Sequence, residues 1–183
     1  MLAEKKKETG AHMREKHNIW PMIMVLAILF GMLQVPHGLA MSDDVIKRRF
    51  EEKAAETVRL DGTKVQVHVE KCFVVLSGTV RFYRQKMLFE RIAWQIMGVE
   101  EVDNEIVVIP RLAISDAAIK GKITEIVKTF PRFHGAGVSV TVSGGAVTLR
   151  GTFSHPLDVQ FLKNQVADIE GVTALEVLAT LRT

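Results

Sequence analysis

Val-Leu-Ser-Gly-Thr-Val at residues 75–80 recurs as Thr-Leu-Arg-Gly-Thr-Phe at residues 148–153. The two stretches lie 73 residues apart, and the same offset aligns residues 44–110 with residues 117–183 without a gap. Fifteen of the 67 aligned positions are identical. The identities fall mainly on glycines and apolar residues, which are the positions that backbone geometry or core packing would require. The sequence therefore predicts an internal duplication.

Both copies are predicted to fold in the order helix, strand, strand, helix, strand, with module 1 over residues 42–110 and module 2 over residues 111–183. The first helices begin after Ser42 and Ser115, which are good N-cap residues followed by aspartates that suit the helix dipole. Apolar residues then recur at helical spacing, to about Leu60 in module 1. Strict alternation of apolar and polar residues predicts a half-buried first strand in each module, followed by a tight turn.

Four glycines that the copies share are predicted to serve the fold: Gly78, Gly98, Gly151 and Gly171. Gly78 and Gly151 lie inside the second strand, where glycine usually marks a bulge or the close approach of another backbone. We expect the following helix to cross the sheet tightly at that point. Gly98 and Gly171 fit the left-handed position at the C-terminus of the second helix.

The last strands are predicted at residues 101–109 and 174–181. A right-handed crossover from the second strand to the third makes each sheet mixed and three-stranded, with both helices on one face. The predicted fold class is therefore α/β (α+β), as two tandem α-β-β-α-β modules.

Composition argues against several classes of function. Residues 41–183 carry 19 basic and 18 acidic side chains, so the strong basic field of a nucleic-acid-binding protein is absent and no nucleic-acid partner is expected. His68, His134 and His155 have no metal-ligand spacing, and no nucleophile is arranged with a base. The sequence therefore predicts no metal site, no cofactor and no enzyme activity. Cys72, the only cysteine, allows no intrachain disulfide.

The N-terminal segment, residues 1–40, is predicted to be a secretory signal peptide. Residues 19–33 are apolar and uncharged, but they are short for a bilayer span. Pro36 then breaks the helix, and small residues precede a cleavage point after Ala40. Met13 offers a simpler translation start. The alternative is an uncleaved anchor that holds the protein in the inner membrane through residues 19–35.

The α-β-β-α-β pattern, with Gly-Thr closing the hairpin and Gly-Val ending the second helix, resembles the BON family of bacterial osmotically inducible periplasmic and nodulation-linked proteins. The resemblance covers nearly all of residues 42–183 as two copies. It implies a periplasmic or envelope location, binding to phospholipid membranes or envelope proteins, a role in envelope integrity or stress tolerance, and no catalysis. Val102-Asp103-Asn104 is similar to the family's Val-x-Asn, where the asparagine would make a hydrogen bond at the start of a strand. Module 2 departs from it with Leu175-Glu176-Val177.

One surface is predicted to bind anionic phospholipid. The first helix of module 2 and the turn after it carry four basic residues and a neighbouring aromatic, which are Lys120, Lys122, Lys128, Arg132 and Phe133. Basic groups are attracted to anionic headgroups, and an exposed Phe133 would insert at the interface. The alternative is a solvated face on an ordinary core helix. The matching helix of module 1 balances its basic residues with acids.

A second surface is predicted to hold an envelope protein partner. Trp94, Met87 and Arg91 share a face of the second helix of module 1 that points away from the apolar stripe. An exposed tryptophan suits such an interface. The alternative, which the sequence favours for Trp94 itself, is burial against module 2.

Overall fold

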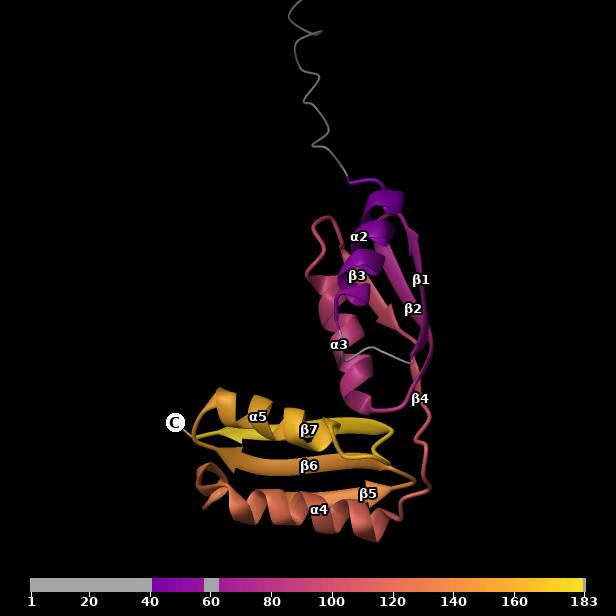
Figure 1. Ribbon diagram of the computed structural model, residues 1–183. Coiled ribbons are helices and arrows are strands. Elements are labelled where there is room, and N and C mark those ends of the chain that lie inside the picture. The colour runs from indigo at the N-terminus through magenta and orange to yellow at the C-terminus, as the bar shows by residue number, and fades with distance from the viewer. Residues whose placement is uncertain (1–40, 58–62, 183) are drawn as a thin grey trace, which may run out of the picture. The chain divides into compact units, whose positions relative to one another are not determined.

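The computed structural model describes residues 41–57 and 63–182 (Figure 1). Module 1 consists of α2 (Asp43–Ala55), β1 (Lys64–Glu70), β2 (Phe73–Val80), α3 (Tyr83–Trp94), β3 (Glu101–Asn104) and β4 (Val107–Val108). Module 2 consists of α4 (Asp116–Thr129), the 3-10 helix η2 (Pro131–Phe133), β5 (Ser139–Ser143), β6 (Ala146–Phe153), α5 (Pro156–Ala167) and β7 (Ala174–Leu181). The predicted fold of two tandem α-β-β-α-β modules is confirmed.

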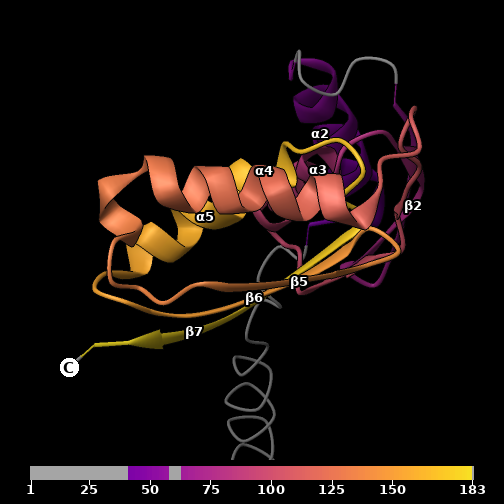
Figure 2. The same cartoon turned by 90° about the horizontal axis from the view of Figure 1, so that it is seen from below.

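Each sheet is mixed. β1 pairs with β2 in antiparallel fashion, from Lys64 opposite Thr79 to Glu70 opposite Phe73, and β3 and β4 pair with β2 in parallel. In module 2, β6 lies between an antiparallel β5 and a parallel β7. Figure 2 shows α4 and α5 on the same face of this sheet. The predicted strand at residues 101–109 is interrupted at residues 105–106, whereas β7 runs without a break.

A separate core fills each module. Ile46, Leu76 and Phe89 lie in the core of module 1, and Ile119 and Leu149 lie in that of module 2. Ile46 aligns with Ile119, and Leu76 aligns with Leu149, at the 73-residue offset. All four side chains are fully buried. The repeat therefore preserves the residues that fill the core, which is where apolar burial contributes most to stability.

The predicted tight turns contain two residues each, Lys71–Cys72 and Gly144–Gly145. Lys71 and Cys72 have φ values of 51° and 65°, and Gly144 and Gly145 have 56° and 80°. Two consecutive positive φ values define the turn that fits the twist of a two-residue hairpin. Glycine adopts this conformation freely, whereas Lys71 and Cys72 adopt it at a steric cost.

The aspartates at the start of the first helices bind these turns. The Asp43 carboxylate accepts hydrogen bonds from the backbone amides of Lys71 at 2.8 Å and Cys72 at 2.9 Å. The Asp116 carboxylate accepts the equivalent bonds from Gly144 at 2.8 Å and Gly145 at 2.9 Å. The sequence predicted only a favourable interaction with the helix dipole. In the structure each aspartate also joins its helix to the far end of its hairpin.

The close approach at Gly78 and Gly151 differs from the expected one. A side chain at Gly78, where φ is 117°, would overlap the backbone carbonyl of Lys64. A Cβ at Gly151 would lie 3.2 Å from the carbonyl oxygen of Ala136. The neighbour in both modules is therefore the backbone that enters the first strand, and not the following helix.

Gly98 and Gly171 have positive φ values of 92° and 100°, but they do not directly cap the second helix. α3 ends at Trp94 and α5 at Ala167, so each glycine lies four residues later, in a further turn. A Cβ at Gly98 would lie 2.9 Å from the Cβ of Met41. The glycine therefore lets this turn pack against the segment that leads into the first helix.

Several predictions on the N-terminal part lie wholly or partly outside the described residues. α2 ends at Ala55, earlier than the predicted Leu60, which itself lies outside the described residues. The predicted signal peptide, its cleavage after Ala40, the start at Met13 and the anchor at residues 19–35 also lie outside them. Among the described helices, none is both long enough and apolar enough to cross a membrane.

Candidate functional site

The outward side of α4 carries the candidate lipid-binding residues. The Ser115 hydroxyl caps the helix by accepting a hydrogen bond of 3.3 Å from the amide of Ala118. Ile119 and Ile123 are fully buried beneath the helix, so the opposite side faces solvent. A shallow, open depression of about 580 Å³ lies on that side. The residues that line it are called the α4 outer face: Ala117, Lys120, Gly121, Thr124, Glu125 and Lys128.

Only two of the three predicted lysines lie together on this face. Lys120 and Lys128 are exposed and both line the depression. Lys122 is exposed but does not line it. Two residues turn a helix by about 200°, so Lys122 lies roughly opposite Lys120 around the axis. The basic groups of the α4 outer face are therefore Lys120 and Lys128, with Glu125 as its acid.

The prediction that Phe133 is an exposed aromatic is wrong. η2 begins at Pro131 and turns the Phe133 side chain inward, where only 2% of it is exposed. Its ring packs against Phe153 and Phe161 in the core of module 2. A polar-looking turn after a helix-ending proline thus contains a core residue, and Phe133 is unavailable to a membrane.

Arg132 is held by its own module. Its guanidinium lies 3.6 Å from the Asp158 carboxylate, and its central carbon lies 4.4 Å from the centre of the Phe161 ring. Both contacts fix the side chain at the end of the helix layer. Arg132 therefore contributes less free positive charge to the surface than the sequence suggested.

The corresponding face of α2 is balanced in charge, as the sequence indicated. At the 73-residue offset, Ala117 and Thr124 of the α4 outer face become Asp44 and Glu51 in module 1. Arg48 pairs with Glu52 at 3.9 Å one helical turn later. The two modules therefore share a core but differ in the surface that their first helices expose.

The residues of the second predicted surface lie in two different environments in the structure. Trp94 is 52% exposed, so its predicted alternative, burial against module 2, does not hold. Arg91 is exposed beside it, and Met97 is 73% exposed one turn later. Met87, in contrast, is partly buried and packs against the core of module 2. The prediction that Met87 shares an open binding face with Trp94 is therefore wrong.

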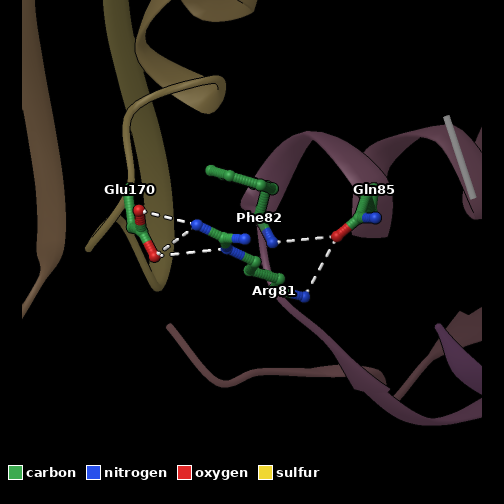
Figure 3. A network of polar contacts seen from close by, with 4 residues as sticks. All are labelled: Arg81, Phe82, Gln85 and Glu170. Carbon is green, nitrogen blue, oxygen red and sulfur yellow. Dashed lines mark hydrogen bonds and ion pairs between the residues drawn. The ribbon is translucent and has the colours of Figure 1, made fainter. Parts of the chain in front are cut away.

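Met87 belongs to a contact between the modules that the sequence did not predict. Arg81 donates hydrogen bonds of 3.0 Å to both carboxylate oxygens of Glu170 (Figure 3). The Gln85 side chain accepts hydrogen bonds of 3.0 Å from the backbone amides of Arg81 and Phe82, which fixes the start of α3. The hydrogen bond and charge of Arg81 lower the pKa of the Glu170 carboxyl below its ordinary value.

Two further side chains of α3 extend this contact. Arg84 lies 3.3 Å from the Asp168 carboxylate and donates to the backbone carbonyl of Asn164 at 3.3 Å. The Tyr83 hydroxyl donates to the carbonyl of Leu175 at 3.4 Å. Burial raises the pKa of the Tyr83 hydroxyl, with a smaller contribution from Glu90. These residues differ between the two copies, so the repeat gave no signal for them.

Asn104 has a different place from the one the resemblance implied. It ends β3 instead of starting a strand. Its amide donates to the carbonyl of Lys86 and to the Glu90 carboxylate, both at 3.1 Å, and its side-chain oxygen accepts from the amide of Ile106 at 3.3 Å. Asn104 therefore joins the end of β3 to α3. Val177 replaces it in module 2, where β7 continues unbroken.

The histidines and the cysteine are dispersed. His68 is exposed on β1, His134 contacts the carbonyl of Lys128 at 3.2 Å, and His155 caps α5 by accepting from the amide of Leu157 at 3.2 Å. Cys72 is a free thiol in the first hairpin turn. No group of three or more potential metal ligands occurs within residues 41–57 and 63–182.

Two copies of a small α/β module, each with its own core and a different exposed surface, define a tandem α-β-β-α-β repeat protein. The family model described as BON domain matches residues 42–110 and residues 115–182. The chain therefore belongs to the BON domain family. No curated protein matches the chain.

Three solved structures resemble the chain at low identity. The C-terminal domain of CdsD, the structural protein of the type III secretion system of Chlamydia trachomatis, is 16% identical, with 78% of this chain and 68% of that chain covered and a TM-score of 0.34. A second CdsD structure is 14% identical, with 87% and 75% covered and a TM-score of 0.33. The PrgH periplasmic domain is 12% identical, with 77% and 82% covered and a TM-score of 0.28.

Proposed function

We propose that this chain is a non-enzymatic module of the bacterial periplasm that docks on anionic phospholipid through the α4 outer face. Its role there is to support envelope integrity or stress tolerance. Membership of the BON domain family and the predicted signal peptide support the location. The docking surface rests on the geometry of α4.

One observation carries the proposal. Lys120 and Lys128 are exposed on the same side of α4, and between them lie the short side chain of Thr124 and the bare backbone of Gly121, with Ala117 one turn before Lys120. Nothing lies within 4 Å of the position that a Cβ of Gly121 would take. A flat charged lipid surface can therefore approach the helix closely, and both ammonium groups can reach headgroups together.

The expected strength is modest. A basic residue near an anionic membrane surface contributes about 1 kcal/mol, which is about fivefold in partitioning per lysine. Phe133 is buried and adds no insertion into the membrane. The attraction is therefore mainly electrostatic, and binding should weaken steeply as salt is added.

Liposome flotation of the purified chain tests the proposal. Vesicles of phosphatidylglycerol and phosphatidylcholine should carry the protein upward, and vesicles of phosphatidylcholine alone should not. The double variant Lys120→Glu with Lys128→Glu should lose binding by more than tenfold, by the estimate of about 1 kcal/mol per basic group. Lys47→Glu with Lys122→Glu is the matched control, because it makes the same charge change away from the α4 outer face. Equal losses in both double variants would contradict the proposal.

The second candidate function is an adaptor that holds an envelope protein through the surface around Trp94. The exposure of Trp94 and Met97 favours it, because large apolar side chains that remain half or more exposed are common at binding surfaces. A photocrosslinker at position 94 in living cells should then trap one discrete protein, and the same probe at Gln66 on the exposed face of β1 should not. Flotation that depends on Lys120 and Lys128, with no crosslink at position 94, would favour the lipid proposal.

A further inference from the structure

The contact between the two modules joins two different surfaces of the repeat. Module 1 contributes the start of its second helix, here called face A, with Arg81, Tyr83, Arg84 and Met87. Module 2 contributes the end of its second helix and the next strand, here called face B, with Asn164, Asp168, Glu170 and Leu175. Because A meets B, the contact is heterologous, and each module has one face that the contact does not use.

The 73-residue offset locates the two unused faces. Face A of module 2 consists of the residues equivalent to those of module 1, which are Ser154, Pro156, Leu157 and Gln160. Face B of module 1 consists likewise of Arg91, Gln95, Met97 and Val102, with Trp94 beside Gln95. No contact within the described chain covers the side chains at the centre of either face. Leu157 is 67% exposed, Met97 is 73% exposed and Trp94 is 52% exposed.

Exposure of large apolar side chains at these positions is informative. Leu157 replaces Arg84, and Met97 replaces Glu170, so the charged groups of the contact within the chain are replaced by apolar groups on the unused faces. An apolar side chain that stays in water does not stabilise the monomer. When a partner covers it, the burial of its apolar surface stabilises the complex. Both unused faces therefore expose a large apolar side chain where the contact within the chain has a charged one.

We propose that this chain associates with further copies of itself head to tail, with face A of module 2 in one copy docked on face B of module 1 in the next. The second copy is the occupant because the chain already makes an A-to-B contact between its own modules, and the new contact repeats it. In the repeated contact Leu157 takes the place of Arg84 and lies against Gln95 and the neighbouring Trp94 of the next copy, and Met97 takes the place of Glu170 and lies against Ser154. A heterologous contact of this kind leaves a free face at each end and can therefore add further copies. The proposal is independent of lipid binding by α4.

The two A-to-B contacts respond differently to solvent. The contact within a chain depends on the Arg81–Glu170 and Arg84–Asp168 ion pairs, which salt screens. The contact between chains has no equivalent of these ion pairs, because Ser154 and Leu157 replace the arginines and Met97 and Gln95 replace the acids. Association between copies should therefore persist in salt that weakens the ion pairs. It should also depend on protein concentration, because no covalent link holds the copies together.

Sedimentation velocity of the purified full chain over a range of concentrations tests the proposal. The wild type should show a weight-average mass that rises with concentration beyond that of a dimer. Leu157→Asp removes face A, and Met97→Asp removes face B. Each variant alone should lose association by about tenfold or more, since a leucine-sized contact is lost and a carboxylate is placed in an apolar site. Leu178→Asp is the matched control, because Leu178 is an exposed leucine on the sheet, outside both faces.

Mixing the two variants gives the sharpest readout. Leu157→Asp retains face B and Met97→Asp retains face A, so an equal mixture should form dimers of one copy of each variant and nothing larger. Circular dichroism of each variant establishes that it is folded. A wild type that stays monomeric at every concentration would overturn the proposal. So would a mixture that stays monomeric, or a Leu178→Asp variant that loses association to the same extent.

Discussion

Asp43 accepts a hydrogen bond of 2.9 Å from the backbone amide of Cys72, which lies 29 residues away in the turn between β1 and β2. The residue at which the first helix begins is thereby fixed to the far end of the hairpin. Asp116 makes the same bond to Gly145. Each module uses a single carboxylate to connect its helix layer to its sheet, at a position where the sequence indicated only a helix N-terminus.

Acidification should weaken this connection. Hydrogen bonds from the amides of Cys72 and Lys71 lower the pKa of the Asp43 carboxyl below its ordinary value. A lowered pKa in the folded state means that the stabilisation is complete above the ordinary aspartate pKa and is lost as pH falls through the folded value. Asp43→Asn should therefore be less stable than wild type at neutral pH, and this difference should shrink in acid. Urea unfolding across pH measures it.

The neighbouring residue supplies the control for that measurement. Asp44 is exposed, and its side chain makes no hydrogen bond or ion pair within the described residues. Asp44→Asn changes the charge of the helix start by the same amount but leaves the turn intact. If both variants lost the same stability with the same pH dependence, the helix dipole would be the cause, and the bond to the turn would contribute nothing measurable.

The conformation of the turns predicts opposite effects of exchanging their residues. Lys71 and Gly144 occupy equivalent positions, with φ values of 51° and 56°. A residue with a side chain pays about 1–2 kcal/mol to adopt this positive φ. Glycine avoids that cost, but it loses more conformational entropy on folding, which offsets part of the gain. Lys71→Gly should therefore stabilise the protein slightly, and Gly144→Lys should destabilise it by about 1 kcal/mol. Thermal unfolding midpoints decide the signs, and two changes of the same sign would contradict the argument.

The predictability of the fold follows from what the repeat retains. Ile46 and Ile119, or Leu76 and Leu149, are identical because a small core tolerates little change, and their periodicity gave the elements directly. Phe133 was misplaced because local sequence does not show whether a turn after Pro131 leads outward or inward. That depends on the contact of its ring with Phe153, a residue from a distant strand.

The contact between the modules was missed for the opposite reason. Arg81 and Glu170 have Ser154 and Met97 as their counterparts, so the contact is made by residues that the copies do not share. Without a partner in view, each looks like an ordinary surface residue. Only the fold shows that they meet. The sequence did carry a signal for the bonds from Asp43 and Asp116 to the turns. Ser-Asp at 42–43 and at 115–116 extends the alignment of the two copies to the N-terminal side of residue 44.

Replacement by alanine should have opposite effects on stability at Gly121 of module 2 and at Gly78 of module 1. Gly121 lies in α4 with nothing near its missing side chain, so Gly121→Ala should stabilise the helix by about 0.5–1 kcal/mol. Gly78 has a φ of 117°, and a side chain there would overlap the Lys64 carbonyl, so Gly78→Ala should strongly destabilise module 1. Urea titration measures both changes, and a neutral Gly78→Ala would refute the close approach.

The ion pair between Arg81 and Glu170 should couple the unfolding of the two modules. Arg81→Ala and Glu170→Gln each break the same pair, so the double variant should lose less stability than the sum of the two single losses. The lowered pKa of Glu170 implies that the coupling is complete above the ordinary glutamate pKa and is lost as pH falls through the folded value. Strict additivity of the two changes at neutral pH would show that the pair contributes no coupling.

The position of Trp94 allows the coupling to be read out module by module. Trp94 reports on module 1, and module 2 contains no tryptophan, whereas far-UV circular dichroism reports on the helices and strands of both. With the pair intact, the fluorescence and circular dichroism transitions in urea should coincide. In Glu170→Gln, or in wild type at acid pH, they should separate, because each core then unfolds with its own stability. Trp20→Phe removes the signal of the other tryptophan and leaves the comparison unambiguous.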